Sequence, residues 1–211
     1  PRGTLIIACG ALGREIAALR GASGWTPIDV TCLPPELHPR PARLAPAVRE
    51  KIRAHRAQYR SIFVAYADCG TGGRLDEVLR EECVERLPGA HCYEFFAGAS
   101  AFAELADAEP GTFFLTDFLT RHFERLVIRG LGIDRPPEPL QEYFGNYRKL
   151  VYLAQIPSPA LIEQARRSAA RLGLAFEHRV TGFGELGTRL TSLAAAAAAD
   201  TDRDRTPAWQ T

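Results

Sequence analysis

Three of the five cysteines lie at or near the ends of segments that are typical of strands in a parallel sheet. Cys9 comes directly after an apolar run at residues 4–8, Cys69 soon after a second run at 61–66, and Cys92 within a third run. Because the carboxyl ends of parallel strands meet at one edge, we expect the three sulfurs to converge there. Thiolates are the usual ligands of zinc and of iron–sulfur clusters. The spacing therefore predicts a metal site holding zinc or an iron–sulfur cluster.

A fourth ligand could come from His38, which lies in a proline-rich loop after the second predicted strand, or from a bound small molecule. Cys9 and Cys69 also precede predicted helices, whose N-termini stabilise thiolates. The alternative is that these cysteines only pack, since free cysteine is one of the most buried residue types. We expect that structural role for Cys32 and Cys83, which should be buried.

Glycines in the same strand–helix turns suggest a second kind of site. Backbone N–H groups at Gly10, Gly70 and Gly72 could bind a phosphate or carboxylate. Neither turn matches the Rossmann or P-loop fingerprint, and tight turns need glycine in any case. Asp68 and Glu94 are candidate acid/base residues, with a capping role as the alternative.

An aromatic segment at residues 143–149 could line a pocket for a flat cofactor, with Tyr147 in contact with it. The alternative is hydrophobic packing beside a strand. The segment leads into the amino end of its strand, away from the proposed site. It could therefore face the cysteines only if its helix folds across the sheet or the chain divides into two lobes there.

Short apolar runs alternate with longer amphipathic stretches, which is typical of βαβ units. Several runs are apolar on both faces, as in a parallel sheet covered by helices. We predict an α/β fold, a three-layer sandwich with a mainly parallel sheet: one domain over residues 1–193, a possible sub-lobe change near 132–148, and a disordered tail at 194–211. The expected strands are 4–8, 28–33, 61–66, 90–95, 112–116, 149–155 and 174–180. The expected helices are 11–20, 45–59, 73–87, 98–107, 117–131, 138–147, 159–172 and 183–193.

Composition narrows the classes of function. The 26 basic and 25 acidic side chains leave a formal charge of +1, which argues against a nucleic-acid partner. The apolar runs are far shorter than the roughly twenty residues that cross a membrane. An odd number of cysteines and the lack of a visible secretory leader favour a reduced, cytoplasmic location.

Five segments together resemble a family known only as domain of unknown function 1638, over roughly residues 5–193. The resemblance implies a setting beside corrinoid-dependent methyl-transfer systems, with a methyl-transfer enzyme as a possible partner, and it supplies no catalytic motif of established role. The segments are 66–70 (Tyr-Ala-Asp-Cys-Gly), 91–94 (His-Cys-Tyr-Glu), 111–119 (Gly-Thr-Phe-Phe-Leu-Thr-Asp-Phe-Leu), 131–134 (Leu-Gly-Ile-Asp) and 143–147 (Tyr-Phe-Gly-Asn-Tyr).

Three hypotheses remain open. The first is a metal-binding protein that works through cysteine thiolates in methyl transfer or one-carbon metabolism. The second is an accessory module that carries a cofactor or metal without turnover. The third is a transferase or hydrolase that binds an anionic small molecule at the glycine turns. Whether the chain is an enzyme is left open.

Overall fold

The computed structural model describes residues 2–23, 25, 27–37, 40–136 and 140–205. The chain divides into two compact units: unit 1 comprises Pro1–Phe95 with Glu185–Thr211, and unit 2 comprises Phe96–Gly184. Each unit has its own sheet. The sequence predicted one domain with a change near 132–148, whereas the two boundaries fall at residues 95–96 and 184–185.

Unit 1 is built on a four-stranded parallel sheet with the order β2-β1-β3-β4. The central strand is fully buried, since Leu5, Ile6, Ile7 and Ala8 are at most 2% exposed. A strand covered on both faces confirms the prediction of a parallel sheet flanked by helices. The strands are β1 (Arg2–Cys9), β2 (Ile28–Leu33), β3 (Tyr59–Ala65) and β4 (Glu85–Arg86).

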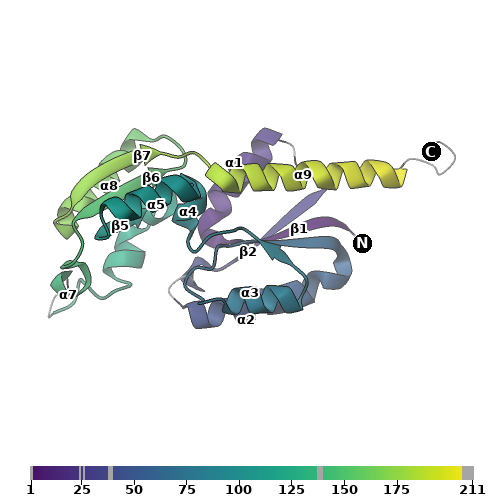
Figure 1. The fold of residues 1–211 in the computed structure, drawn as a ribbon, viewed down its shortest axis with the longest axis horizontal. Coiled ribbons are helices and arrows are strands. Elements are labelled where there is room, and N and C mark those ends of the chain that lie inside the picture. Colours follow the sequence, from purple (N-terminus) through teal and green to yellow (C-terminus); the bar gives the residue numbers. More distant parts are fainter. Residues whose placement is uncertain (1, 24, 26, 38–39, 137–139, 206–211) are drawn as a thin grey trace. The chain divides into compact units, whose positions relative to one another are not determined.

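Helices cover both faces of the sheet in unit 1, with α2 and α3 on one face and α1 and α9 on the other (Figure 1). On the α9 side, Arg189 forms an ion pair with Glu85 and its guanidinium lies 5.5 Å from the centre of the Phe63 ring. The chain leaves β1 toward β2 through α1 and returns past β1 to β3 through α2. The helices are α1 (Gly13–Ser23), α2 (Pro41–His55), α3 (Arg74–Glu81) and α9 (Gly184–Arg205), with short 3-10 turns η1 (Gly10–Leu12), η2 (Pro35–Leu37) and η3 (Arg56–Gln58).

The strand order places a topological switch point between β1 and β3, because the chain leaves these neighbouring strands toward opposite sides of the sheet. In open parallel sheets, the crevice at such a point is where ligands bind, outside the carboxyl ends of the strands. The carboxyl ends of β1 and β3 are therefore the place to look for a site.

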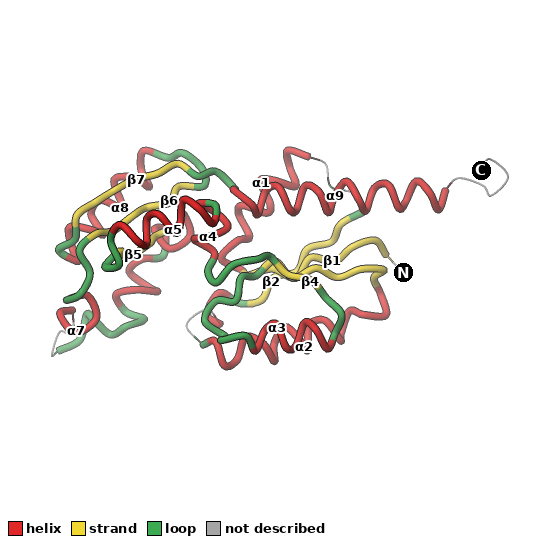
Figure 2. Tube along the Cα trace, viewed as in Figure 1, coloured by secondary structure: helices red, strands yellow, loops and turns green. Residues whose placement is uncertain are grey.

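Unit 2 contains a three-stranded parallel sheet with the order β5-β6-β7. Figure 2 shows its strands running alongside one another between helices. Its core includes Leu115, Phe123, Leu150 and Tyr152. The strands are β5 (Thr112–Leu115), β6 (Lys149–Ala154) and β7 (Ala175–Val180); the helices are α5 (Ala99–Ala108), α6 (Asp117–Arg121), the π-helical turn η4 (Glu124–Ile128), α7 (Leu140–Phe144) and α8 (Pro159–Leu172).

The helix α8 confirms the predicted range 159–172, and its terminal residues explain its bounds. Ser158 accepts a hydrogen bond from the Leu161 N–H, 3.4 Å away, and Pro159 occupies the first turn. Gly173, with φ of 71°, ends the helix in the left-handed conformation that glycine adopts most easily.

The predicted strand at 90–95 is wrong. That segment turns and then enters the helix α4 (Cys92–Ala97). The fourth strand of unit 1 is instead β4, which the sequence assigned to the end of a helix. The helix α3 ends at Glu81, and Cys83, with φ of 51°, reverses the chain so that Glu85 pairs with Phe63.

Other boundaries also differ from the prediction. The expected helix 117–131 is split into α6 and η4, and α7 is shorter than expected, with residues 137–139 outside the described part. The helix α9 continues to Arg205, into the segment for which the sequence predicted a disordered tail. Among the described residues, none of the helices combines the length and apolar character that crossing a membrane takes.

Candidate functional site: a cysteine cluster in unit 1

The switch point of unit 1 brings together residues from β1 and from the loop after β3. Cys9 is the last residue of β1, and Ala8 pairs with Ala65 at the end of β3. The residues that follow this pair are Cys9, which ends β1, and Tyr66, which comes directly after β3. Both are buried, at 7% and 2% exposure.

Asp68 shapes the loop that carries Cys69. Its carboxylate accepts hydrogen bonds from the Thr71 hydroxyl and from the N–H groups of Gly72 and Gly73, each 3.1 Å away. Burial raises the pKa of Asp68, but these hydrogen bonds outweigh it and hold the pKa below its ordinary value. The loop keeps Cys69 at φ of 51°, a left-handed conformation that few non-glycine residues adopt.

A second loop brings Cys92 to the same place. The Cys69 N–H donates to the Ala90 carbonyl at 2.8 Å. The Ala90 N–H in turn donates to the Glu94 carboxylate at 2.8 Å. A side chain at position 89 would be strained, because Gly89 has φ of 95° and a Cβ atom would lie 2.8 Å from a Glu94 oxygen. Cys92 begins α4 two residues after this contact.

The three thiols, which we call the cysteine cluster (Cys9, Cys69 and Cys92), act on one another electrostatically. Burial raises the pKa of each thiol, to about 12 for Cys69 and well above the ordinary 9.0 for Cys92. Cys9 raises the pKa of Cys69, and both raise the pKa of Cys92. The structure thus brings these side chains into one neighbourhood.

The raised pKa values overturn one expectation. The sequence suggested that helix N-termini would stabilise thiolates at Cys9 and Cys69. Burial prevails instead, because the interior disfavours the charged form. Cys9 is followed by the short 3-10 turn η1 and not by a full α-helix. The thiols of the metal-free chain are therefore neutral near pH 7.

Two buried residues next to Cys9 were missed by the sequence reading. Tyr66 has a hydroxyl with no hydrogen-bond partner among the described residues, although it lies close enough to lower the pKa of the Cys9 thiol. Glu15, in the first turn of α1, is 2% exposed and raises the pKa of the same thiol. Only their place beside a strand end could have indicated them.

The cysteine cluster is not preformed as a complete ligand set. Within the described ranges, no group of three or more His, Cys, Asp or Glu side chains is arranged to hold a metal ion. The proposed fourth ligand, His38, lies outside the described residues.

The two remaining cysteines do not have the predicted role. Cys32, on β2, and Cys83, after α3, are exposed, so the expectation that they are buried packing residues is wrong. Cys32 lies toward the edge of the sheet, on the outer strand β2. Cys83 serves the sharp turn that leads into β4.

The glycine turns have structural partners. The N–H groups of Gly72 and Gly73 are already used by the Asp68 carboxylate, which leaves them fewer donors for an anion. Gly70, with φ of 78°, serves the turn. At Gly10, a Cβ atom would lie 2.8 Å from Pro35, so this glycine allows the chain after β2 to approach closely.

A further glycine pattern lies outside these turns. Residues 182–187 read Gly-x-Gly-x-x-Gly, beginning after β7 and running into the first turn of α9. Within the described part of the chain no strand follows α9, so the βαβ unit that gives this fingerprint its meaning is incomplete.

The aromatic segment packs within unit 2. The Tyr147 ring lies 5.8 Å from Phe113 and 5.3 Å from Phe144, centre to centre. These contacts are at the amino end of β6. They favour the packing role over a cofactor contact.

Unit 2 has its own buried polar centre at the carboxyl edge of its sheet. The Asp117 side chain is fully buried and accepts hydrogen bonds from the Tyr152 hydroxyl (2.7 Å) and the N–H groups of Gln155 (3.0 Å) and Ile156 (3.1 Å). Burial and the bond to Asp117 raise the pKa of Tyr152, which keeps it a neutral donor.

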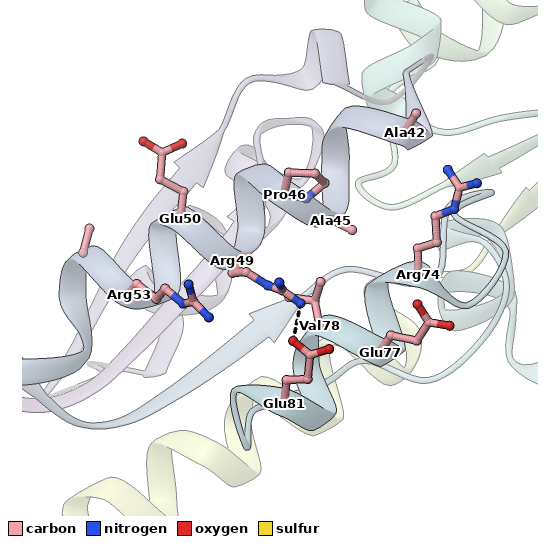
Figure 3. A pocket seen from close by; sticks show the side chains of 11 residues that line it. Ala42, Ala45, Pro46, Arg49, Glu50, Arg53, Arg74, Glu77, Val78 and Glu81 are labelled. Atoms are coloured by element: carbon pink, nitrogen blue, oxygen red, sulfur yellow. Dashed lines mark hydrogen bonds and ion pairs between the residues drawn. The ribbon is translucent and has the colours of Figure 1, made fainter.

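An open groove of about 820 Å³ lies between α2 and α3 of unit 1 (Figure 3). Ala45, Pro46 and Val78 contribute to its floor. On its rim, Arg49 and Glu81 form an ion pair at 2.5 Å. Nothing at this groove indicates an occupant.

Comparison with known proteins yields a family and no function. No curated protein and no solved structure matches the chain. A family described as "Protein of unknown function (DUF1638)" matches residues 32–190, which include Cys69 and Cys92 and begin after Cys9. Since the match covers well over half of the chain, this protein belongs to the DUF1638 family.

Proposed function

We propose that unit 1 binds a thiophilic metal ion, such as zinc, through the thiolates of Cys9, Cys69 and Cys92. The observation that carries this proposal is the meeting of three thiols from three separate segments at the switch point of the sheet. A shared place in a ligand-binding crevice is hard to explain by packing alone.

Binding exchanges protons for the metal. Each neutral thiol releases its proton to solvent and forms a metal–sulfur bond, because only the thiolate is a good ligand. Three thiolates and a divalent ion leave one net negative charge and an open fourth position. Cys69 lies in a loop and Cys92 begins α4 directly after one, so binding would require these segments to rearrange and complete the ligand set.

The open position supports a binding or transfer role. A metal held by three thiolates can accept a soft sulfur ligand or activate it as a nucleophile. The corrinoid-linked methyl transfer suggested by the family resemblance would use the site in this way. The anion-binding alternative has less support, since Asp68 already occupies glycine N–H groups of the loop.

The test is titration of the reduced, full-length chain with Co²⁺, which reports thiolate ligation by sulfur-to-metal charge-transfer absorption. We expect one Co²⁺ per chain, displaced by Zn²⁺. Cys69→Ser should weaken binding on the order of a hundredfold or more, since even outer partners of metal ligands change affinity 10–100-fold. The exposed Cys83→Ser is the matched control and should bind as the natural chain does.

Two results would overturn the proposal. One is the absence of thiolate charge-transfer bands in the natural chain at saturating Co²⁺. The other is equal affinity in the Cys69→Ser and Cys83→Ser variants, with circular dichroism showing that both are folded.

A further inference from the structure

The strand β7 leaves one edge of the unit 2 sheet without a strand partner. It stands last in the order β5-β6-β7, and among the described residues β6 is the one strand that pairs with it (Figure 1). Proteins usually protect such edges by short strands, prolines or bulges. The other outer strands follow this rule, since β4 has two residues, β5 has four, and β2 lies between Pro27 and Pro34. In contrast, β7 has six residues in unbroken register with β6.

Alternate residues of β7 direct their backbone groups to this open edge. The N–H groups of Ala175 and Thr181 donate to carbonyls directly before β6 and at its end, at 3.0 Å each. Because backbone groups along a strand alternate between its two edges, the odd-numbered residues bond to β6. The N–H and C=O groups of Phe176, His178 and Val180 therefore point outward, and a further strand must pair with these residues.

The charges of β7 complement an antiparallel copy of the same strand. Residues that exchange hydrogen bonds lie opposite each other, so an outward residue must face an outward residue. The two-fold axis of such a pair can then pass through residue 177, 178 or 179 near the middle of the strand. An axis at 177 or 179 places two Glu177 or two Arg179 side chains opposite each other, and like charges there are destabilising. The axis at 178 instead places Glu177 opposite Arg179 of the second copy, on both sides of the axis.

The apolar residues of the edge agree with the same register. It pairs Phe176 with Val180 of the second copy, on the face of the sheet opposite to the charged pairs. Val180 is 58% exposed in the single chain. An aromatic residue opposite a β-branched one is a favourable cross-strand pair. Pairing would thus cover an exposed apolar side chain.

The charged side chains keep capacity for a second partner. Glu177 accepts from Lys149 at 2.9 Å and from Arg179 at 2.6 Å through different carboxylate oxygens. Both Glu177 and Arg179 are partly exposed, at 28% and 48% of their side chains. A carboxylate has about four acceptor sites and a guanidinium about five N–H donors, so each can bind a further group. A second copy would extend the pair into a network, which stabilises more than an isolated surface pair does.

We propose that the outer edge of β7 is a homodimer interface, in which two chains pair this strand antiparallel about a two-fold axis at His178. The two-fold axis closes the assembly, so it yields dimers and not filaments. The two sheets join into one continuous sheet. This inference is independent of the metal proposal.

The test is the dissociation constant of the dimer, measured by sedimentation of the full-length chain at up to about 0.1 mM, because small interfaces bind weakly. A reductant excludes disulfide dimers through the exposed Cys32 and Cys83. We expect a reversible monomer–dimer equilibrium. Glu177→Arg and Arg179→Glu, each alone, should raise the dissociation constant about tenfold or more, because each places like charges opposite one another.

A mixture of these two variants separates the interface from misfolding. In the mixed dimer every charged pair again has opposite signs, so the mixture should dimerise as the natural chain does. Val180→Pro removes an outward N–H and leaves the ladder to β6 intact, and it should abolish the dimer. The control is Glu81→Arg on α3, which reverses another ion-paired charge and should change nothing.

Three results would overturn the proposal. One is a natural chain that stays monomeric. Another is a dimer that tolerates Val180→Pro and Glu177→Arg as well as it tolerates Glu81→Arg, because that dimer uses a different surface. The third is a mixture of the two charge variants that fails to dimerise although circular dichroism shows both to be folded.

Discussion

Both sheets have buried polar groups at the carboxyl ends of their strands, but the groups of the two units differ in their hydrogen bonding. In unit 2, the buried Asp117 carboxylate receives hydrogen bonds from Tyr152, Gln155 and Ile156. In unit 1, the Tyr66 hydroxyl has no partner among the described residues, and the neighbouring thiols are neutral.

The difference teaches how to tell a structural polar centre from a candidate site. A buried charge with a full set of donors stabilises the fold around it and has no capacity left for a ligand. Groups with unused capacity lower stability in the free chain, and a ligand can reverse that cost. By this criterion Asp117 supports the fold of unit 2, and the cysteine cluster is the candidate site.

The largest expected effect concerns the buried Asp117 carboxylate of unit 2. Asp117→Ala should lower the free energy of unfolding by about 3–5 kcal/mol, because it leaves buried donors without an acceptor. Urea unfolding measures this loss, with the exposed Asp107→Ala on α5 as the control. A loss below about 1 kcal/mol for Asp117→Ala would show that the centre does not support unit 2 and would break the comparison.

The second prediction concerns protons at the cysteine cluster. The thiols are protonated at pH 7.5, because burial raises their pKa from the ordinary 9.0, to about 12 at Cys69. Zn²⁺ should therefore release about three protons per ion, and its affinity should rise up to about a thousandfold per pH unit. Proton release into weakly buffered indicator measures this.

The same pKa values predict the opposite trend for the metal-free fold. The unfolded chain loses thiol protons from about pH 9 upward while folded Cys69 keeps its proton up to about pH 12. Stability should therefore fall as pH rises through this interval.

In the Zn²⁺ experiment, proton release near zero together with a Zn²⁺ affinity independent of pH would mean that the thiols are already ionised.

The smallest expected effect concerns Asp68, whose carboxylate shapes the loop that carries Cys69 in unit 1. Asp68→Ala should cost about 1–2 kcal/mol of stability, since its loop is partly exposed and its N–H groups can turn to water. The left-handed Cys69 would no longer be held in place, so Co²⁺ affinity should fall as well. Asp68→Asn, which keeps one acceptor oxygen, should lie between the natural chain and Asp68→Ala in both measurements. Unchanged Co²⁺ affinity in Asp68→Ala would show that the loop does not position Cys69.

Part of this molecule was predictable from local sequence. The helix α8 begins and ends at its cap residues, Ser158 and Gly173, because capping depends on side chains only a few residues apart. The buried strands β1, β3 and β6 were predicted as apolar runs. Because parallel strands run in the same direction, the sequence already predicted that Cys9 and Cys69 lie near one edge of the sheet, without the strand order.

Other features depend on contacts between residues far apart in the sequence, and only the tertiary structure shows them. The two-residue strand β4 exists because Glu85 and Arg86 reach the edge of β3, and no periodicity marks so short a segment. The run at 90–95 suits a strand or a helix equally, and the hydrogen bond from Cys69 to Ala90 selects the turn that leads into α4. The division into two sheets and the burial of Asp117 and Tyr66 depend on residues distant in the chain. Sequence alone determined which segments could form strands and helices, whereas their pairing decided which buried polar groups found hydrogen-bond partners.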